Sequence, residues 1–290
     1  MNFFTSFRFF YYFLFIHYFA ANFCMPVFID QTGRSVSLSA TAQRIISLVH
    51  SQTELLFDLG LNKEVIGITK FCIHPDEWFR TKTRIGGTKQ LKMDIIHQLQ
   101  PDLIIANKEE NVKEQIEELE KHYPVWISDV NNLADAYEMI DQTGLITNKQ
   151  QSAHEIINRI KESFSKLETR NSKPATCYLI WQNPYMTAGG DTFIHSMLEA
   201  AGFENMYADK TRYPEITIDQ LQSRSLSGAG CQLLFLSSEP FPFTQKHIDE
   251  LQPLLPNTSI ILVDGEMFSW YGSRMQYAPE YFVRLPVQLK

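Results

Sequence analysis

The sequence lacks the short motifs by which many enzyme active sites are found. It has no G-x-G-x-x-G after a strand, no G-x-x-x-x-G-K-[ST], no G-x-S-x-G and no H-E-x-x-H. Phosphate-binding loops, nucleophile elbows and the zinc-protease helix therefore find no support. Gly228-Ala229-Gly230 precedes a predicted strand, which indicates a turn. We expect a protein that is not an enzyme and requires no cofactor.

Positive charge and paired cysteines are also scarce. The formal net charge is −7, and a nucleic-acid backbone needs a basic surface, so we expect no nucleic-acid partner. The 4 cysteines form no C-x-x-C, and Cys72, Cys177 and Cys231 are scattered through the body of the chain, so we expect no disulfide framework. Cys177 and Cys231 adjoin predicted strands and are expected to be small buried side chains.

The apolar run at residues 9–21 is too short to span a bilayer comfortably, because a spanning helix needs about 20 residues. Residues 1–24 resemble a secretory leader, with Arg8 as a weakly positive start before an apolar core. Phe23, however, fits neither a small-residue cleavage site nor a lipoprotein box. We expect an exported, periplasmic protein. The alternative is that Met25 is the true start and the protein is cytoplasmic.

Strand and helix signals alternate along the body of the chain. The apolar runs at residues 44–49, 103–106, 177–181 and 233–236 are typical of buried strands, and amphipathic stretches separate them. A chain of 290 residues is long enough for about two domains. This alternation predicts an α/β fold with parallel sheets in two lobes.

A long helix is predicted at residues 147–170, between the two halves. Thr147 and Gln150 fit the T-x-x-Q capping box, Pro174 follows the predicted end, and the helix would reach about 34 Å. It is either one more core helix or a rigid strut between lobes. The predicted parts are residues 1–24 (leader), 25–146 (first lobe), 147–172 (connecting helix) and 173–290 (second lobe). The apolar stripe comprises Ala153, Ile156, Ile157, Ile160, Phe164 and Leu167.

Aromatic and hydrogen-bonding side chains follow the predicted strand ends. Ligands bind beyond the carboxyl ends of parallel strands, and flat aromatic faces with few charges suit a large, planar, partly apolar ligand. A single loop aromatic more often only covers the edge of a core. The residues are His50, Ser51, Phe71, His74, Trp78, Asn107, Lys108, Trp181, Tyr185 and residues 268–271.

Metal binding has weaker support than aromatic stacking. His50 and Glu54 are four residues apart and could share a helix face, and His74 lies in a loop that contains a proline. Each histidine is more readily explained as a polar contact than as a metal ligand.

The two halves also share a local pattern. Asp94 and Asp219 each stand at the start of a short predicted helix that leads into a strand. Capping of the helix explains an aspartate at this position equally well.

Taken together, several segments resemble one family, the iron-siderophore/vitamin B12 type of periplasmic substrate-binding protein of ABC importers. The resemblance covers nearly the whole body from Val27 onward. It implies two α/β lobes joined by one long helix, a ligand held in the cleft between them, little lobe closure and no catalysis. The segments are residues 30–34, 44–48, 53–54, 65–67, 85–87, 101–104, 185–189 and 270–274.

The resemblance also implies roles for particular residues. Asp94 and Asp219 would dock on a membrane permease, although both are aspartates where glutamate is typical. The ligand would be a corrinoid of the cobalamin type or an iron chelate, and the protein a monomer. Haem, a ferric siderophore, or a cytoplasmic corrinoid-binding role from Met25 are the alternatives. His50 and His74 could reach an open metal position. The pocket residues would be His50, Phe71, His74, Asn107, Met186, Tyr213 and Trp270.

Overall fold

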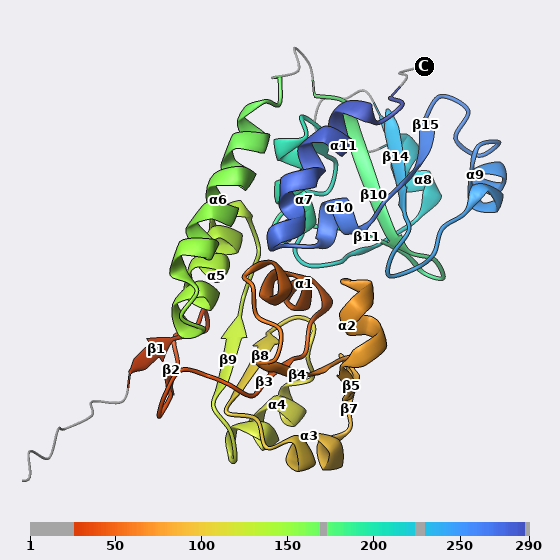
Figure 1. Cartoon of the computed structure of the whole chain (residues 1–290). Coiled ribbons are helices and arrows are strands. Elements are labelled where there is room, and N and C mark those ends of the chain that lie inside the picture. The colour runs from red at the N-terminus through yellow and green to blue at the C-terminus, as the bar shows by residue number, and fades with distance from the viewer. Residues whose placement is uncertain (1–25, 169–172, 224–229, 288–290) are drawn as a thin grey trace, which may run out of the picture.

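The computed structural model describes residues 26–168, 173–223 and 230–287. The predicted leader, most of the Gly228-Ala229-Gly230 turn and the predicted helix end at Arg170 lie outside these ranges. The chain forms two α/β lobes, one above the other, with a long helix along one side of both (Figure 1).

The first lobe is built on a five-stranded sheet in the order β5-β4-β3-β8-β9, with all neighbours parallel. Its central strands are short apolar runs covered on both faces, as a parallel sheet requires. The strands are β3 (Ile45–Ser47), β4 (Val65–Ile68), β5 (Thr83–Arg84), β8 (Leu103–Asn107) and β9 (Val125–Ser128), with hairpins β1 (Val27–Ile29)–β2 (Ser35–Ser37) and β6 (Gly86–Gly87)–β7 (Gln90–Leu91).

Helices α1 (His50–Asp58), α2 (Asp76–Thr81), α3 (Met93–Leu99) and α4 (Lys113–Glu120) connect these strands. Trp78, which the sequence placed in a ligand-facing loop, lies on α2 and is fully buried. Its ring packs edge-on against that of Phe57, with 5.3 Å between the ring centroids. That prediction was wrong, because the indole is part of the core.

The second lobe has a six-stranded sheet, ordered β13-β11-β10-β14-β15 with β12 beside β10. Strands β10, β12, β14 and β15 are parallel, whereas β11 pairs antiparallel with both β10 and β13, so this sheet is mixed rather than purely parallel. The elements are β10 (Ala175–Trp181), β11 (Tyr185–Thr187), α7 (Phe193–Ala200), β12 (Glu204–Asn205), β13 (Glu215–Ile216), α8 (Ile218–Ser223), β14 (Leu233–Ser237), α9 (Gln245–Leu251), β15 (Ser259–Val263), α10 (Glu266–Ser269), the 3₁₀ helix η1 (Ser273–Tyr277) and α11 (Ala278–Arg284).

The connector is an antiparallel pair of helices, α5 (Leu133–Ile146) and α6 (Gln150–Ser165), and α6 rises to the second lobe (Figure 1). The predicted start at Thr147 was wrong: Thr147 closes α5, and its hydroxyl donates to the Thr143 carbonyl over 2.6 Å. Helix α6 ends at Ser165, so its 16 residues reach about 24 Å rather than 34 Å. Four members of the predicted apolar stripe, Ala153, Ile156, Ile157 and Ile160, are buried on α6, whereas Phe164 is only partly buried and Leu167 lies beyond the end of the helix.

A second segment also joins the lobes. After α10 the chain passes through Gly272 into η1, which packs against α1 of the first lobe and against the connecting helix α6. Helix α11 then returns to the second lobe. Gly272 has φ 115°, and a Cβ there would lie 3.3 Å from the Ser51 carbonyl oxygen. Glycine is needed because this backbone conformation is essentially closed to other residues.

The predicted buried cysteines are confirmed: Cys177 and Cys231 are buried free thiols, as is Cys72. Among the described residues, no helix combines the length and the apolar character that crossing a membrane requires.

Candidate functional site

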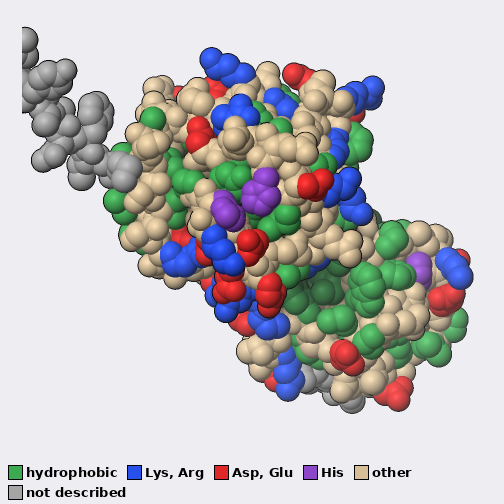
Figure 2. Space-filling view, turned by 90° about the horizontal axis from the view of Figure 1, so that it is seen from below, with side chains coloured by type: hydrophobic (Ala, Val, Ile, Leu, Met, Phe, Trp, Pro, Cys, Tyr) green, Lys and Arg blue, Asp and Glu red, His purple; other side chains and the backbone are tan. Residues whose placement is uncertain are grey.

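The carboxyl ends of the parallel strands of both sheets face one gap between the lobes. From the first lobe come His50 after β3, His74 after β4 and the 108–111 turn after β8; from the second come the segments after β14 and β15. Contacts that join the two sides include the rings of His50 and Trp270. Seen from below, the surface is hollowed between the lobes and apolar side chains line the hollow (Figure 2). This is the cleft that the strand order predicts.

Trp270 lies at one end of this cleft. Its indole is only 3% exposed, and its Nε1 donates to Glu239 Oε1 over 2.8 Å. The ring centroid lies 4.3 Å from that of His50 and 5.6 Å from that of His74. Burial and the positive charge of Arg274 lower the pKa of His50 to about 4, so this imidazole is neutral at pH 7.

Arg274 links both lobes beside Trp270. Its Nε and Nη2 each donate to Glu54 over 2.7 Å, and its Nη1 lies 2.8 Å from Glu266. His74 lies 3.4 Å from the same Glu266 carboxylate. Because Arg274 holds both oxygens of Glu54, the suggested metal pair of His50 and Glu54 is not formed. Within the described residues, no group of three or more His, Cys, Asp or Glu side chains could hold a metal ion.

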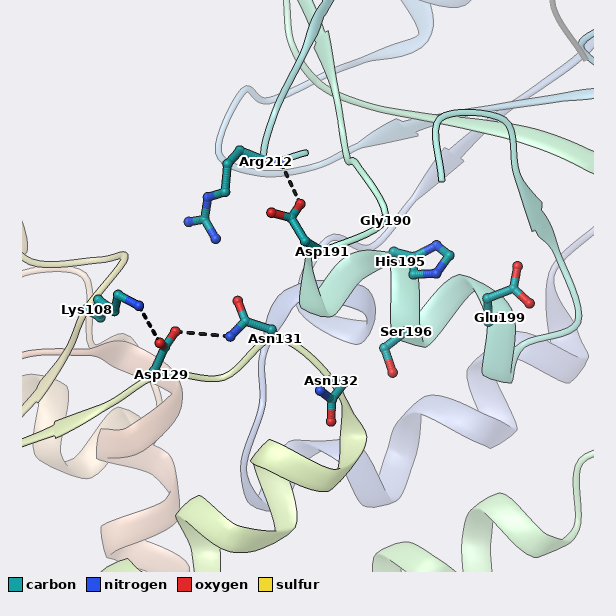
Figure 3. Close-up of a pocket in the computed structure, with 10 residues that line it drawn as sticks. All are labelled: Lys108, Asp129, Asn131, Asn132, Gly190, Asp191, His195, Ser196, Glu199 and Arg212. Carbon is teal, nitrogen blue, oxygen red and sulfur yellow. Dashed lines mark hydrogen bonds and ion pairs between the residues drawn. The ribbon is translucent and has the colours of Figure 1, made fainter. Parts of the chain in front are cut away.

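A polar cavity of about 660 Å³ opens at a different part of the interface between the lobes (Figure 3). This volume is within the range of small-molecule sites, about 300 to 1,000 Å³. Asn132 caps α5, and the Ser196 hydroxyl of α7 accepts from the Leu133 N–H over 3.2 Å, so a contact between the lobes stands beside the cavity. The lining residues are Lys108, Asp129, Asn131, Asn132, Gly190, Asp191, His195, Ser196, Glu199 and Arg212.

The cations at this cavity are paired. Lys108 Nζ lies 2.5 Å from Asp129, and Arg212 Nη2 lies 3.2 Å from Glu109. The Arg212 backbone N–H donates to Asp191 over 2.5 Å, which fixes the loop that carries Arg212. These contacts leave the cavity polar but nearly balanced in charge.

Two partly buried glutamates stand nearby on opposite walls. Burial raises the pKa of Glu110, as do the charges of Glu109 and Glu239. Burial also raises the pKa of Glu239, although hydrogen bonds from Ser269 and Trp270 oppose the shift. The charge of Glu239 is among the causes that raise the pKa of Glu110, so these two carboxyl groups affect each other across the cleft.

The structure brings together only part of the predicted ligand-binding set. His50, His74 and Trp270 form one contact group. Tyr213 lies beside Arg212, and its hydroxyl pKa is raised by burial and by the charge of Glu109. Phe71, 50% exposed, lies over Gly87, while Met186 is partly buried on β11, between β13 and β10.

Asn107 is buried and its side chain is already used. Its Nδ2 donates to Ser128 Oγ over 3.0 Å, and its Oδ1 accepts from the Glu109 and Glu110 N–H groups. In this conformation Asn107 shapes the turn after β8 and does not face a ligand, which contradicts its predicted place in the pocket. Lys108, the next residue, lines the cavity instead.

Sequence reasoning missed Glu110, Glu239, Arg212 and the role of Arg274. A signal was present for two of them: Arg212 precedes Tyr213, and Arg274 belongs to the W-Y-G-S-R segment. Glu239 gave no signal, because its importance depends on a contact with Trp270 that lies 31 positions away.

Comparison with known proteins agrees with this architecture. Residues 45–229 match the family described as periplasmic binding protein. The chain is 26% identical over 189 residues to a vitamin B12-binding protein of Vibrio campbellii, covering 63% of this chain and 68% of the relative. The periplasmic heme-binding protein RhuT from Roseiflexus sp. RS-1 superposes with a TM-score of 0.71 at 19% identity, covering 83% of this chain and 97% of RhuT. The vitamin B12 binding protein BtuF of Vibrio cholerae gives 0.68 at 19%, covering 83% and 95%.

The family match spans well over half of the chain. The protein therefore belongs to the periplasmic binding protein family, of the iron-siderophore/vitamin B12 type that its sequence resembles. This family consists of binding proteins rather than enzymes. The structural similarities, at under 25% identity, establish the two-lobed fold.

Proposed function

We propose that this protein is the substrate-binding component of an ABC importer. It captures a corrinoid of the cobalamin type, or a related metal chelate, between its lobes and delivers the ligand to a membrane permease. The observation that carries the proposal is the polar cavity of about 660 Å³ that residues of both lobes line together. The similarity to the vitamin B12-binding protein of Vibrio campbellii supports a corrinoid as the ligand.

The polar cavity suits the rim of such a chelate. Asn131, Asn132 and Ser196 supply neutral donors and acceptors from both lobes, and a corrinoid carries neutral carboxamides around its ring. Tyr213 follows the cavity-lining Arg212, whose guanidinium lies over the Tyr213 ring at 5.7 Å from its centroid, so this aromatic ring adjoins the cavity. We expect the chelate to lie with its rim in the cavity and its ring against Tyr213.

Haem is the second candidate, supported by the similarity to RhuT. His50 carries no charge at pH 7, and both His50 and His74 contact the ring of Trp270, so we infer that one of these imidazoles would reach an open metal position. No catalytic step is proposed for either ligand.

Calorimetry on the purified protein with cyanocobalamin, haemin and ferrioxamine B tests the proposal. Binding of at least one chelate, weakened in Tyr213→Ala, is the expected result. Tyr277→Ala, which removes a tyrosine that is 55% exposed on η1, serves as the control. If none of the chelates binds, the proposed function is wrong.

Export is proposed along with this function. Amino-terminal sequencing of the native protein tests it: a terminus after a cleaved leader supports export, and an intact terminus at Met25 would contradict it.

A further inference from the structure

The cations that face the cleft and the cavity are already neutralised by carboxylates. Arg274 is held by Glu54 and Glu266, with all three side chains less than one fifth exposed. Arg212 pairs with Glu109, and Lys108 pairs with Asp129. An anionic ligand would have to compete with these carboxylates for the same guanidinium and ammonium groups.

The remaining basic groups nearby do not reverse this balance. His50 is neutral, because burial and Arg274 keep its pKa at about 4. Lys89 is exposed, and its Nζ donates to the backbone carbonyl of Glu109 over 2.7 Å. Lys70 is exposed beside the ring of Phe71, at 4.9 Å from its centroid.

Two carboxyl groups, in contrast, form no ion pair in the described part of the chain, although the charge of Lys89 acts on Glu110 from a distance. Within residues 26–168, 173–223 and 230–287, neither Glu110 nor Glu239 forms an ion pair. Glu239 accepts hydrogen bonds from Trp270 Nε1 and from Ser269 Oγ, which fix its position without cancelling its charge. The two residues come from opposite lobes, after β8 and after β14, and the charge of Glu239 acts on Glu110 across the space between them.

We propose that this cleft selects metal chelates that are neutral or positively charged and discriminates against chelates that carry carboxylate or catecholate groups. The inference rests on the proposed function and narrows it. A ligand carboxylate would be desolvated close to Glu110 and Glu239, where the described cations are already paired, and like charges brought together at an interface repel each other. Neutral carboxamides meet neutral partners in Asn131, Asn132 and Ser196.

Matched ligand pairs test the charge preference while the metal-binding part of the ligand stays the same. The first pair is cyanocobalamin and its monocarboxylic acid, in which one propionamide is hydrolysed. The second is ferrioxamine B, which carries an ammonium, and its N-succinyl derivative, which carries a carboxylate. In whichever pair binds, we expect the neutral or cationic member to bind at least about tenfold more tightly at pH 7.5.

The outcomes separate the two proposals. If the carboxylate member binds as tightly as its partner, the charge inference is wrong and the proposed function stands. If haemin binds more tightly than every neutral or cationic chelate, the inference is likewise overturned. If no chelate of any charge binds, the proposed function fails and the inference falls with it.

A double variant tests which residues are responsible. Glu110→Gln with Glu239→Gln removes both charges, while the Gln side-chain oxygen can still accept from Trp270 Nε1. In this variant, the ratio of the affinity for the neutral or cationic ligand to the affinity for its carboxylate partner should fall severalfold toward one. Glu162→Gln, on the exposed face of α6 where Glu162 pairs with Lys166, should leave the preference unchanged. If the double variant does not fold, the same preference is measured in the single variant Glu110→Gln. An unchanged preference in a folded variant contradicts the assignment.

Discussion

Both carboxylate oxygens of Glu54 accept hydrogen bonds from Arg274, each over 2.7 Å, although the two residues are 220 positions apart. This pair fastens the segment after α10 to helix α1 of the first lobe. Arg274 also reaches Glu266 at 2.8 Å and covers the ring of Trp270, with Cζ 4.9 Å from its centroid. One side of the cleft is therefore closed by an ion-pair network rather than open for stacking.

Removal of this guanidinium should destabilise the protein. Arg274→Ala leaves Glu54 and Glu266, which are 13% and 17% exposed, without a cation. Breaking a buried pair costs about 3 to 5 kcal/mol, so we expect a loss of that order in the free energy of unfolding, measured in urea. Arg284→Ala removes an exposed pair with Glu280 on α11 and should cost less than about 1 kcal/mol. Equal losses in the two variants would contradict a structural role for the network.

His50 should remain neutral far below the ordinary histidine range. Burial, and then the charge of Arg274, lower its pKa from 6.5 to about 4. Between these values the unfolded chain binds more protons than the folded one, so His50 makes stability fall as pH falls from 6.5 toward 4, by up to about 3 kcal/mol. We expect the His50→Gln variant to lose less stability than the wild type between pH 7 and pH 4.5.

NMR titration of the imidazole protons checks the same point directly. His154, an exposed histidine 2.9 Å from Asp141, gives the comparison within the same spectrum. A midpoint for His50 near 6.5 would show that the imidazole is solvated and that the cleft is open at Trp270.

The strands could be predicted because their signal is local. The runs that form β3 and β8 are apolar at successive positions, as a strand covered on both faces requires. The start of α6 could not be placed in the same way. Thr147 and Gln150 satisfy a capping pattern, yet the chain turns there between two packed helices, and Gly144 permits their contact: a Cβ on it would lie 2.4 Å from Ala153 Cβ.

The site was predicted less well than the fold, for a physical reason. Strand ends and aromatic loops identify a cleft, but which side chain faces the ligand depends on contacts that the local sequence does not specify. Asn107 lies at the end of a correctly predicted strand, but its side chain is hydrogen-bonded to Ser128 and to two backbone N–H groups and does not face the ligand. Glu54 was a candidate metal ligand because of its spacing from His50, but its carboxylate accepts a hydrogen bond from Arg274, which lies near the carboxyl end of the chain.

Asp94 and Asp219 remain our proposed permease contacts. Both are exposed in the first turn of a short helix, Asp94 on α3 of the first lobe and Asp219 on α8 of the second (Figure 1). We expect Asp94→Ala with Asp219→Ala to abolish uptake in cells while ligand affinity changes by less than about twofold, because exposed carboxylates contribute little to folding. Asp76→Ala with Asp249→Ala, which alters exposed aspartates of the same two lobes, is the matched control. Loss of affinity in the first variant would place these residues in the pocket or the fold instead.

Ligand binding should change the angle between the lobes only slightly. The single helix α6 was expected to act as a stiff strut, and the structure adds a second connection through residues 270–277. Gly272 lies against the Ser51 carbonyl, and Arg274 is fixed to Glu54, so a large hinge motion would have to break packed and charged contacts together. Small-angle scattering of the wild type with and without bound chelate should give superimposable curves. The Arg274→Ala variant should show a larger difference, because it removes the ionic fastening and leaves α6 in place; a large closure in the wild type would contradict the rigid arrangement.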